Sequence, residues 1–283
     1  MTGEKLRNLL ARADKEGYAI PSFNYSDIWD FLAIAEAAEE ENAPIMIASN
    51  PLVAKAISVE ICGSIGKAAM AKAKTPLFHH LDHSFEIDLC KAAVDNGYPS
   101  VMIDASKYDL AKNIETVREV VEYAHARGVF VEGEIGKIKG KGIEGDYAGG
   151  DFLAEVADAV ALAEKTGLDS LAVGIGSAHG FYEGKPQLNF ERLKEIDDAV
   201  NVPLVLHGGT GIPKEDIQKA IHNGINKINV GTIIHCTYMN NMRSELNHLG
   251  ENPYTLDVVK PVIAEIKKVV KGWIKVCMAD NKA

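Results

Sequence analysis

The sequence lacks a long apolar run. None of its 283 residues belongs to a stretch of the roughly 18 apolar positions that a membrane-spanning helix needs. The first ten residues, MTGEKLRNLL, also lack the apolar centre of a secretory signal. We therefore expect a cytoplasmic protein with no membrane partner.

Basic charge is scarce as well. Lysine and arginine number 30 against 40 aspartates and glutamates, which gives a formal net charge of −10. A general nucleic-acid surface would need a basic stripe to meet the phosphates, so no nucleic-acid partner is expected. Small anionic substrates stay compatible with this charge, because one pocket can differ in sign from the whole protein.

Cysteines and linkers are few. The four cysteines are widely spaced and form no CxxC motif: Cys62, Cys90, Cys236 and Cys277. We expect free, mostly packed thiols. Because no linker or low-complexity segment divides the chain, residues 1–283 are expected to form a single domain.

Short apolar runs alternate with longer helix-like stretches along the whole chain. The candidate strands are residues 19–24, 44–48, 76–80, 100–104, 129–134, 170–175, 203–207 and 227–230. Eight strands, each followed by a helix, predict an α/β fold of the (β/α)8 TIM-barrel type. The runs are continuously apolar, as in a parallel sheet that is buried on both faces.

Several helical segments carry their own end signals. Residues 113–128 close with Gly128, and residues 151–167 combine Asp151 as an N-cap with Gly167 after the end. Residues 261–276 predict an extra C-terminal helix packed on the barrel or on a partner. The rival fold is an open doubly wound sheet, but no GxGxxG motif follows the first strand to support its dinucleotide-binding form.

Histidines follow three of the expected strands. The segment PLFHHLDHSF places His83 after the third strand, while His179 follows the sixth and His207 ends the seventh. The carboxyl ends of barrel strands converge on one face, which carries the active site. Any one histidine alone is more often structural, but three that converge favour a divalent metal, with Zn²⁺ as the best match to neutral imidazole ligands.

Carboxylates lie at the same strand ends. Asp82 is interpreted as an acid/base group that faces the substrate. Asp104 and Glu134 either orient the ligand histidines, or hold the metal in another position, or serve as caps and loop anchors. At least one of His79 and His80 is expected to point into the barrel or to pack behind the site.

Two glycine turns have the composition of a phosphate site. HGGTGIP, residues 207–213, follows the seventh strand, and INVGT, residues 228–232, leaves the eighth. Loops after strands seven and eight form the recurrent phosphate site of this barrel. A metal, a carboxylate and a phosphate site together suit a phosphorylated carbonyl compound as the substrate.

Residues 136–150 hold six glycines and three lysines and are either a lid over the barrel mouth or a solvated loop.

The motifs HLDH (residues 80–83), SVMIDAS (100–106), DSLAVGIGSAHG (169–180), VPLVLHGGTGIP (202–213) and KINVGT (227–232) resemble class II ketose-bisphosphate aldolases of the fructose- and tagatose-bisphosphate types. The resemblance implies zinc-dependent aldol cleavage that releases dihydroxyacetone phosphate from a phosphorylated sugar. His83, His179 and His207 would be the zinc ligands, Asp82 the proton donor and acceptor, and Asp104 with Glu134 the holders of a second metal.

The resemblance also implies substrate contacts and an assembly. Contacts to dihydroxyacetone phosphate would come from residues of three loops: Gly180, Gly208, Gly209, Thr210, Asn229, Val230, Gly231 and Thr232. Some relatives bind a monovalent cation near this phosphate, and a homodimer or homotetramer is expected. Relatives place a proton-exchanging glutamate in the mobile loop, where Glu144 is the nearest match.

The departures from the family pattern concern substrate choice. Gly231 and Ile233 stand where acidic residues are common, and a small residue at 231 is more typical of the tagatose branch. ENPYTLDVVKP, residues 251–261, lacks the arginine that helps hold the distal phosphate in relatives; Lys260 or Arg243 would substitute, or the distal phosphate is absent.

Three other hypotheses stay open. The chain is a non-catalytic sugar-phosphate binder, or a lyase for another keto-sugar phosphate on the same scaffold. Lys227, which lies within an expected strand, is a weak candidate for a Schiff base, because the three histidines would then lack a purpose.

Overall fold

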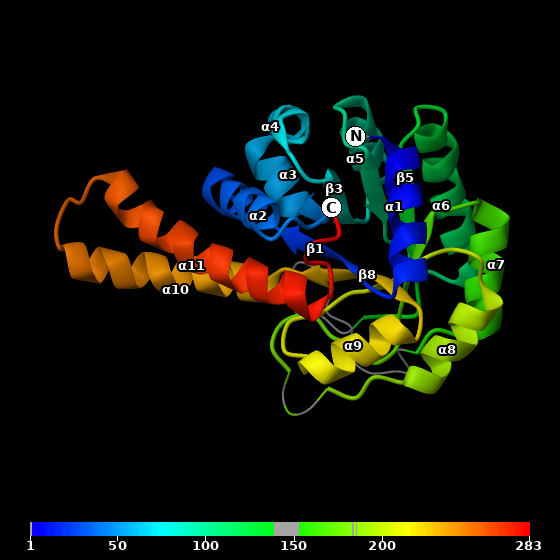
Figure 1. Cartoon of the computed structure of the whole chain (residues 1–283). Coiled ribbons are helices and arrows are strands. Elements are labelled where there is room, and N and C mark those ends of the chain that lie inside the picture. The colour runs from blue at the N-terminus through cyan, green and yellow to red at the C-terminus, as the bar shows by residue number, and fades with distance from the viewer. Residues whose placement is uncertain (1, 139–152, 183, 185) are drawn as a thin grey trace.

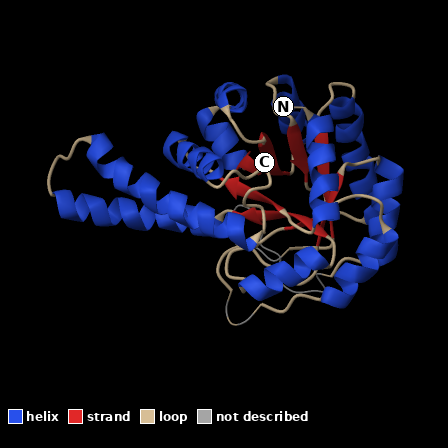
Figure 2. Cartoon of the chain, in the orientation of Figure 1, coloured by secondary structure: helices blue, strands red, loops and turns tan. Residues whose placement is uncertain are grey.

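A computed structural model of the chain describes residues 2–138, 153–182, 184 and 186–283. Its described strands form one closed parallel barrel in which each strand pairs with the next along the chain and the last pairs with the first. Figure 2 shows the strands at the centre with helices around them. The strands are β1 (Ile20–Asn24), β2 (Ile45–Ser49), β3 (Leu77–Ser84), β4 (Ser100–Ile103), β5 (Phe130–Ile135), β6 (Ser170–Val173), β7 (Leu204–Leu206) and β8 (Ile225–Val230).

Helices lie outside the strands and fill the connections between them (Figure 1). They are α1 (Gly3–Glu16), α2 (Ile28–Glu40), α3 (Pro51–Ile57), α4 (Val59–Lys72), α5 (Ile87–Asp95), α6 (Leu110–His125), α7 (Val156–Thr166), α8 (Phe190–Ala199), α9 (Lys214–His222), α10 (Thr232–Leu249) and α11 (Thr255–Val276). The barrel prediction is confirmed, and the open doubly wound alternative is wrong because β1 pairs with β8.

The predicted end signals agree in part with the observed helices. Gly167 ends α7 in the left-handed conformation, as expected. The predicted cap Asp151 lies outside the described residues, and the observed N-cap of α7 is Glu155. Pro213 lies at the N-cap of α9.

Helix α1 lies across the amino ends of the strands. The Gly3 N–H donates to the Gly128 carbonyl just before β5, and Asn226 at the start of β8 donates to Asp14 of α1. Asp169, just before β6, binds Arg7 of α1 and His125 of α6. This end of the barrel is therefore covered, and the opposite end is the one left for a site.

Apolar side chains pack between the strands and the surrounding helices and form the hydrophobic core. Burying each large aliphatic or aromatic side chain contributes about 1.5–3 kcal/mol. The centre of the barrel is different, because it also holds buried polar side chains: Ser22, His80, Ser100, Glu132, Ser170 and Lys227. The four cysteines are free, as predicted.

The hairpin of α10 and α11 projects beyond the barrel (Figure 1). Helix α11 packs against α10 and α2, so the predicted C-terminal helix forms and is longer than expected. The chain then returns to the barrel, where the Ala19 N–H donates to the Cys277 carbonyl. None of the helices in the described ranges combines the length and the apolar character that crossing a membrane requires.

Candidate functional site

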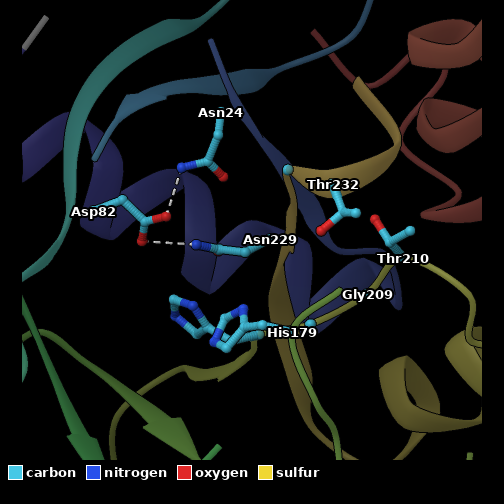
Figure 3. A pocket seen from close by; sticks show the side chains of 10 residues that line it. Asn24, Asp82, His179, Gly209, Thr210, Asn229 and Thr232 are labelled. Atoms are coloured by element: carbon cyan, nitrogen blue, oxygen red, sulfur yellow. Dashed lines mark hydrogen bonds between the residues drawn. The ribbon is translucent and has the colours of Figure 1, made fainter. Parts of the chain in front are cut away.

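A cavity opens at the carboxyl ends of the strands (Figure 3). Its lining comes from the ends of β1, β3, β6, β7 and β8: Asn24, Asp82, His179, His207, Gly208, Gly209, Thr210, Asn229, Gly231 and Thr232. These residues are up to 208 positions apart in sequence, and the closed barrel brings them together.

The three predicted histidines meet at this cavity. Their ligating nitrogens lie within 4.8 Å of one another. The ring of His83 lies 4.9 Å from that of His179 and 4.3 Å from that of His207, centroid to centroid. Three imidazoles at these distances can surround one divalent cation and leave a coordination position open.

The environment of His207 fits a metal ligand. Its Nε2 lies 2.9 Å from Oε1 of Glu132, whereas its buried Nδ1 has no hydrogen-bond partner among the described residues. Burial, followed by the nearby His83, lowers the pKa of His207 to about 4, so the imidazole is neutral at pH 7. The neutral ring is the form that coordinates metals.

Asp104 and Glu134 gather on the other side of His83. The His83 Nδ1 lies 3.3 Å from Asp104 Oδ2 and 3.9 Å from Glu134 Oε2. One atom of each of these residues falls within 4.8 Å of the others, so they form a second group able to hold a metal. Asp104 is a loop anchor as well, because its Oδ1 accepts from the backbone N–H and the hydroxyl of Ser106.

The two carboxyl groups of this second group have opposite shifts. Burial, and then the neighbouring Asp104 charge, raises the pKa of Glu134 well above its ordinary value. Burial opposes ionisation of Asp104 too, but hydrogen bonds and charge from His83 and the bonds from Ser106 outweigh it and lower its pKa. Two negative charges this close would repel each other, so the pair favours the state in which one carboxyl group is ionised and the other is protonated.

Asp82 lies between two amides (Figure 3). Asn24 Nδ2 donates to Asp82 Oδ2 at 2.7 Å, and Asn229 Nδ2 donates to Oδ1 at 2.9 Å. Burial would raise the pKa of Asp82, but electrostatic interactions with His83, His207 and Lys227 outweigh burial and lower it. The side chain is thus an oriented carboxylate that faces the cavity without belonging to either metal-binding group.

An irregularity in β3 lets Asp82 and His83 serve the same site. The register with β4 shifts between Leu81 and Ser84, and His83 has a φ of 46°. Adjacent residues of a regular strand point to opposite faces, so this left-handed residue breaks the alternation. The predicted third strand ends at residue 80, whereas the observed strand continues to Ser84.

The two earlier histidines of the segment face different surroundings. His80 Nδ1 pairs with Ser100 Oγ at 2.8 Å in the barrel centre, and its Nε2 lies 4.0 Å from Asp82 Oδ1. His79 instead stacks on Tyr98, with ring centroids 4.0 Å apart, and packs against Gly66 of α4 outside the barrel. One histidine therefore points inward, as predicted.

The two glycine turns lie side by side at the cavity. The Gly209 N–H donates to the Asn229 carbonyl, and Thr210 Oγ1 accepts from the Ile233 N–H at the start of α10. Gly208 has a φ of 70°, and a Cβ there would lie 2.3 Å from the Ala178 carbonyl oxygen. Of the predicted substrate contacts, Gly180 and Val230 are not part of the lining, and Val230 is buried in the core.

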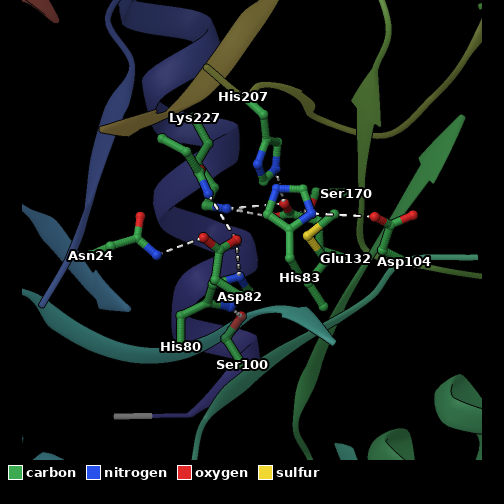
Figure 4. A network of polar contacts seen from close by, with 12 residues as sticks. Asn24, His80, Asp82, His83, Ser100, Asp104, Glu132, Ser170, His207 and Lys227 are labelled. Carbon is green, nitrogen blue, oxygen red and sulfur yellow. Dashed lines mark hydrogen bonds and ion pairs between the residues drawn. The ribbon is translucent and has the colours of Figure 1, made fainter. Parts of the chain in front are cut away.

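The structure adds three polar groups that sequence analysis did not assign to the site. Asn24 is the first, since it binds Asp82. Tyr182 is the second, because its hydroxyl accepts from the Ala178 N–H and donates to the Gly208 carbonyl, which ties the His179 loop to the glycine turn. The third is the Glu132–Lys227 pair (Figure 4), which makes Lys227 a poor Schiff-base candidate. The signals in the sequence were a glutamate near the end of the fifth expected strand and a lysine inside the eighth.

Two of the predicted features fall elsewhere. Glu144 and the rest of residues 139–150 of the glycine-rich loop lie outside the described residues. The distal-phosphate candidates Arg243 and Lys260 lie on α10 and α11, the helices of the projecting hairpin, and neither lines the cavity.

Comparison with known proteins agrees with this geometry. Residues 4–282 match the family described as fructose-bisphosphate aldolase class II, so the chain belongs to that family and is an aldolase, a lyase. It is 39% identical to fructose-bisphosphate aldolases of Staphylococcus aureus and Staphylococcus epidermidis over 98% of each chain. It also aligns with the YdjI aldolase of Escherichia coli K12 at a TM-score of 0.87, with 31% identity over 100% of both chains.

A second solved structure aligns still more closely in space. It is a putative fructose-1,6-bisphosphate aldolase from Coccidioides immitis, with a TM-score of 0.90 and 29% identity over 97% of this chain and 96% of that one. The family acts on phosphorylated sugars and depends on a metal, which agrees with the histidine-rich site.

Proposed function

We propose that this aldolase is zinc-dependent and reversibly cleaves a ketose 1,6-bisphosphate of the fructose or tagatose type to dihydroxyacetone phosphate and an aldehyde. The observation that carries the proposal is the meeting of His83, His179 and His207 within 4.8 Å of one another, at a cavity that Asp82 also lines. The relatives named as fructose-bisphosphate aldolases support the same substrate type.

The three histidines would hold the zinc. A bound divalent cation acts as a Lewis acid that stabilises the negative charge left on the ketone half when the carbon–carbon bond breaks. Three protein ligands with one open position are the arrangement of catalytic zinc sites. Imidazole is also a better match to zinc than to Mg²⁺ or Ca²⁺, which prefer oxygen ligands.

Asp82 would move the proton. During cleavage it takes the proton of the hydroxyl on C4, and during condensation it returns that proton to the aldehyde oxygen. The bonds from Asn24 and Asn229 to its two oxygens are suited to this role, because they aim the carboxylate while it remains ionised.

The glycine turns would hold the phosphate of dihydroxyacetone phosphate. Gly208, Gly209 and Thr210 of the first turn and Asn229, Gly231 and Thr232 of the second all line the cavity. Thr232 begins the 18-residue helix α10, and a helix N-terminus favours an anion. Gly180 and Val230 remain predicted contacts, and a monovalent cation near this phosphate also remains a prediction.

Asp104 and Glu134 would act through His83, either by orienting its ring or by holding a second divalent cation. Both roles agree with the distances of 3.3 and 3.9 Å to the His83 Nδ1. The first role follows the common pairing of ligand histidines with carboxylates.

An aldolase for a ketose that carries a single phosphate is the second candidate. Within the described residues, the cavity is lined by no lysine or arginine and offers one glycine cradle. Gly231 and Ile233 at the start of α10 add no charge for a distal phosphate. Substrates with and without that phosphate therefore belong in the same screen.

We further propose a cytoplasmic homodimer or homotetramer. The projecting α10–α11 hairpin exposes large apolar side chains that a second copy would cover: Met239, Leu246, Leu249 and Tyr254. Such exposure beyond the barrel is typical of interaction surfaces. Sedimentation of the purified protein checks the assembly.

Chelation is the test of the proposed chemistry. Exhaustive removal of metal should abolish cleavage of the ketose bisphosphates, and stoichiometric zinc should restore it, whereas Mg²⁺ should not. Cleavage by the metal-free protein at the original rate would refute the zinc proposal. Tight binding of every sugar phosphate in the screen without turnover would instead identify a non-catalytic binder.

A further inference from the structure

A buried ion pair next to His207 joins β5 to β8 (Figure 4). Glu132 of β5 and Lys227 of β8 are both fully buried. The Lys227 Nζ lies 3.0 Å from one carboxylate oxygen of Glu132 and 2.8 Å from the other. Neither residue lines the cavity, so neither is needed to contact substrate.

Stability alone does not account for this pair. Barrel interiors are ordinarily filled by branched apolar residues. A buried ion pair loses much of its attraction to desolvation, and apolar residues of similar volume often leave a protein equally stable or more stable. A fully buried pair at this depth therefore calls for a role other than holding the barrel together.

The contact of Glu132 with His207 indicates that role. Glu132 Oε1 lies 2.9 Å from His207 Nε2. An ionised carboxylate can only accept, so the proton of the neutral ring must be on Nε2. The other nitrogen, Nδ1, then carries the lone pair, and it has no hydrogen-bond partner in the described part of the chain.

Lys227 and Ser170 fix the carboxylate in turn. Lys227 binds both oxygens of Glu132, and the Ser170 hydroxyl donates to Oε2 at 3.3 Å. Lys227 of β8 and Ser170 of β6, together with His207 just after β7, thus hold Glu132 in one orientation. Without the lysine charge, an uncompensated carboxylate would be buried in the barrel centre.

We propose that Glu132 and Lys227 are a positioning pair that sets the tautomer and orientation of His207 and thereby the metal affinity of the histidine site. The inference rests on the proposed role of His207 as a metal ligand. Outer partners of ligand histidines typically change metal affinity by about 10- to 100-fold when they are removed.

Two paired variants separate this role from packing. E132L/K227M removes both charges and the acceptor, while E132Q/K227M removes both charges but keeps a carbonyl oxygen for the His207 Nε2–H. Co²⁺ is titrated into the metal-free proteins, and the visible absorption of the bound ion gives the affinity. E132L/K227M should bind Co²⁺ about 10- to 100-fold more weakly than the parent, and E132Q/K227M should recover most of the loss.

Reference variants make the outcomes distinct. H207A should lose most Co²⁺ affinity, and D169N at the covered end of the barrel should keep it. If H207A binds Co²⁺ as the parent does, the proposed function fails. If H207A loses affinity but E132L/K227M does not, or if both paired variants lose it equally, the positioning role is overturned.

A measurement on the unaltered chain covers the case in which the paired variants do not fold. In protein labelled with ¹⁵N-histidine, long-range proton–nitrogen spectra distinguish the two tautomers of a neutral ring, and H207A assigns the signal. The proposal requires the Nε2–H tautomer for His207 in both the metal-free and the Zn²⁺-loaded protein. An Nδ1–H tautomer in the loaded protein would overturn it.

Discussion

Replacing Asp82 by asparagine tests the proposed proton transfer with the smallest change of shape. Asp82 accepts from Asn24 through one oxygen and from Asn229 through the other. An asparagine at this position offers one oxygen and one NH₂ group. It therefore keeps one of these hydrogen bonds and turns a donor toward the second amide, and it can no longer take a proton.

The expected loss follows from these two effects. Positioned acid–base groups contribute about 10²- to 10⁴-fold to a rate, which is about 3–5 kcal/mol of transition-state stabilisation. The hydrogen bond that Asp82 loses to one of the two amides is worth about 1.5–3 kcal/mol. Because this bond joins two protein groups, its loss lowers folding stability and does not act on the activation barrier alone. We expect kcat to fall by about 10²- to 10⁴-fold with little change in KM.

A coupled assay that detects dihydroxyacetone phosphate measures kcat and KM, and Co²⁺ titration measures metal affinity in the same preparations. Asp109→Asn is the matched control, because Asp109 caps α6 at the surface and asparagine caps a helix equally well. The reasoning would be refuted by a kcat equal to that of the parent. Loss of Co²⁺ affinity would show that Asp82 acts on the metal instead.

Two further predictions concern a glycine and a buried acid. Gly208→Ala should raise KM for the sugar phosphate, because its Cβ would lie 2.3 Å from the Ala178 carbonyl oxygen. Gly17→Ala has nearly the same φ but open space around the new Cβ, so it should lose less stability and leave KM unchanged. Equal KM values for the two variants would contradict this. Burial would raise the pKa of Asp169, but bonds from His125, Arg7 and a backbone N–H lower it below its ordinary 3.8. The ionised Asp169 therefore stabilises the fold above pH 3.8, and this stabilisation is lost as the pH falls through the lowered pKa. Asp169→Asn should lower the free energy of unfolding in urea by about 1.5–3 kcal/mol at pH 7. The difference should become progressively smaller below pH 3.8. A difference that does not depend on pH would exclude this linkage.

The order of the strands could be predicted because each one is a short apolar run bounded by turn residues. Every expected range overlaps an observed strand. The ends were harder to predict, since β3 continues four residues past its expected end through a register shift that depends on contacts with β4. Sequence periodicity carries no signal for such a long-range contact.

The candidate site shows the same limit. His83, His179 and His207 could be grouped from sequence alone, because each follows a strand and a barrel gathers strand ends. The hydrogen-bond partners of those histidines could not be predicted. Glu132 and Lys227 are 95 positions apart, and their pairing across the barrel depends on which face of β5 and β8 turns inward. The role of Asn24 could not be predicted either, because uncharged amides are common at strand ends and do not by themselves indicate a site.

The left-handed backbone at His83 places a restriction on any attempt to transplant this chemistry. Strain of this kind costs of order 1–3 kcal/mol and persists only where the surroundings enforce it. Grafting the side chains alone onto a regular strand of another barrel would send one of the two neighbours, 82 or 83, outward. A designer would have to copy the kinked peptide itself, together with the β4 contacts that hold it.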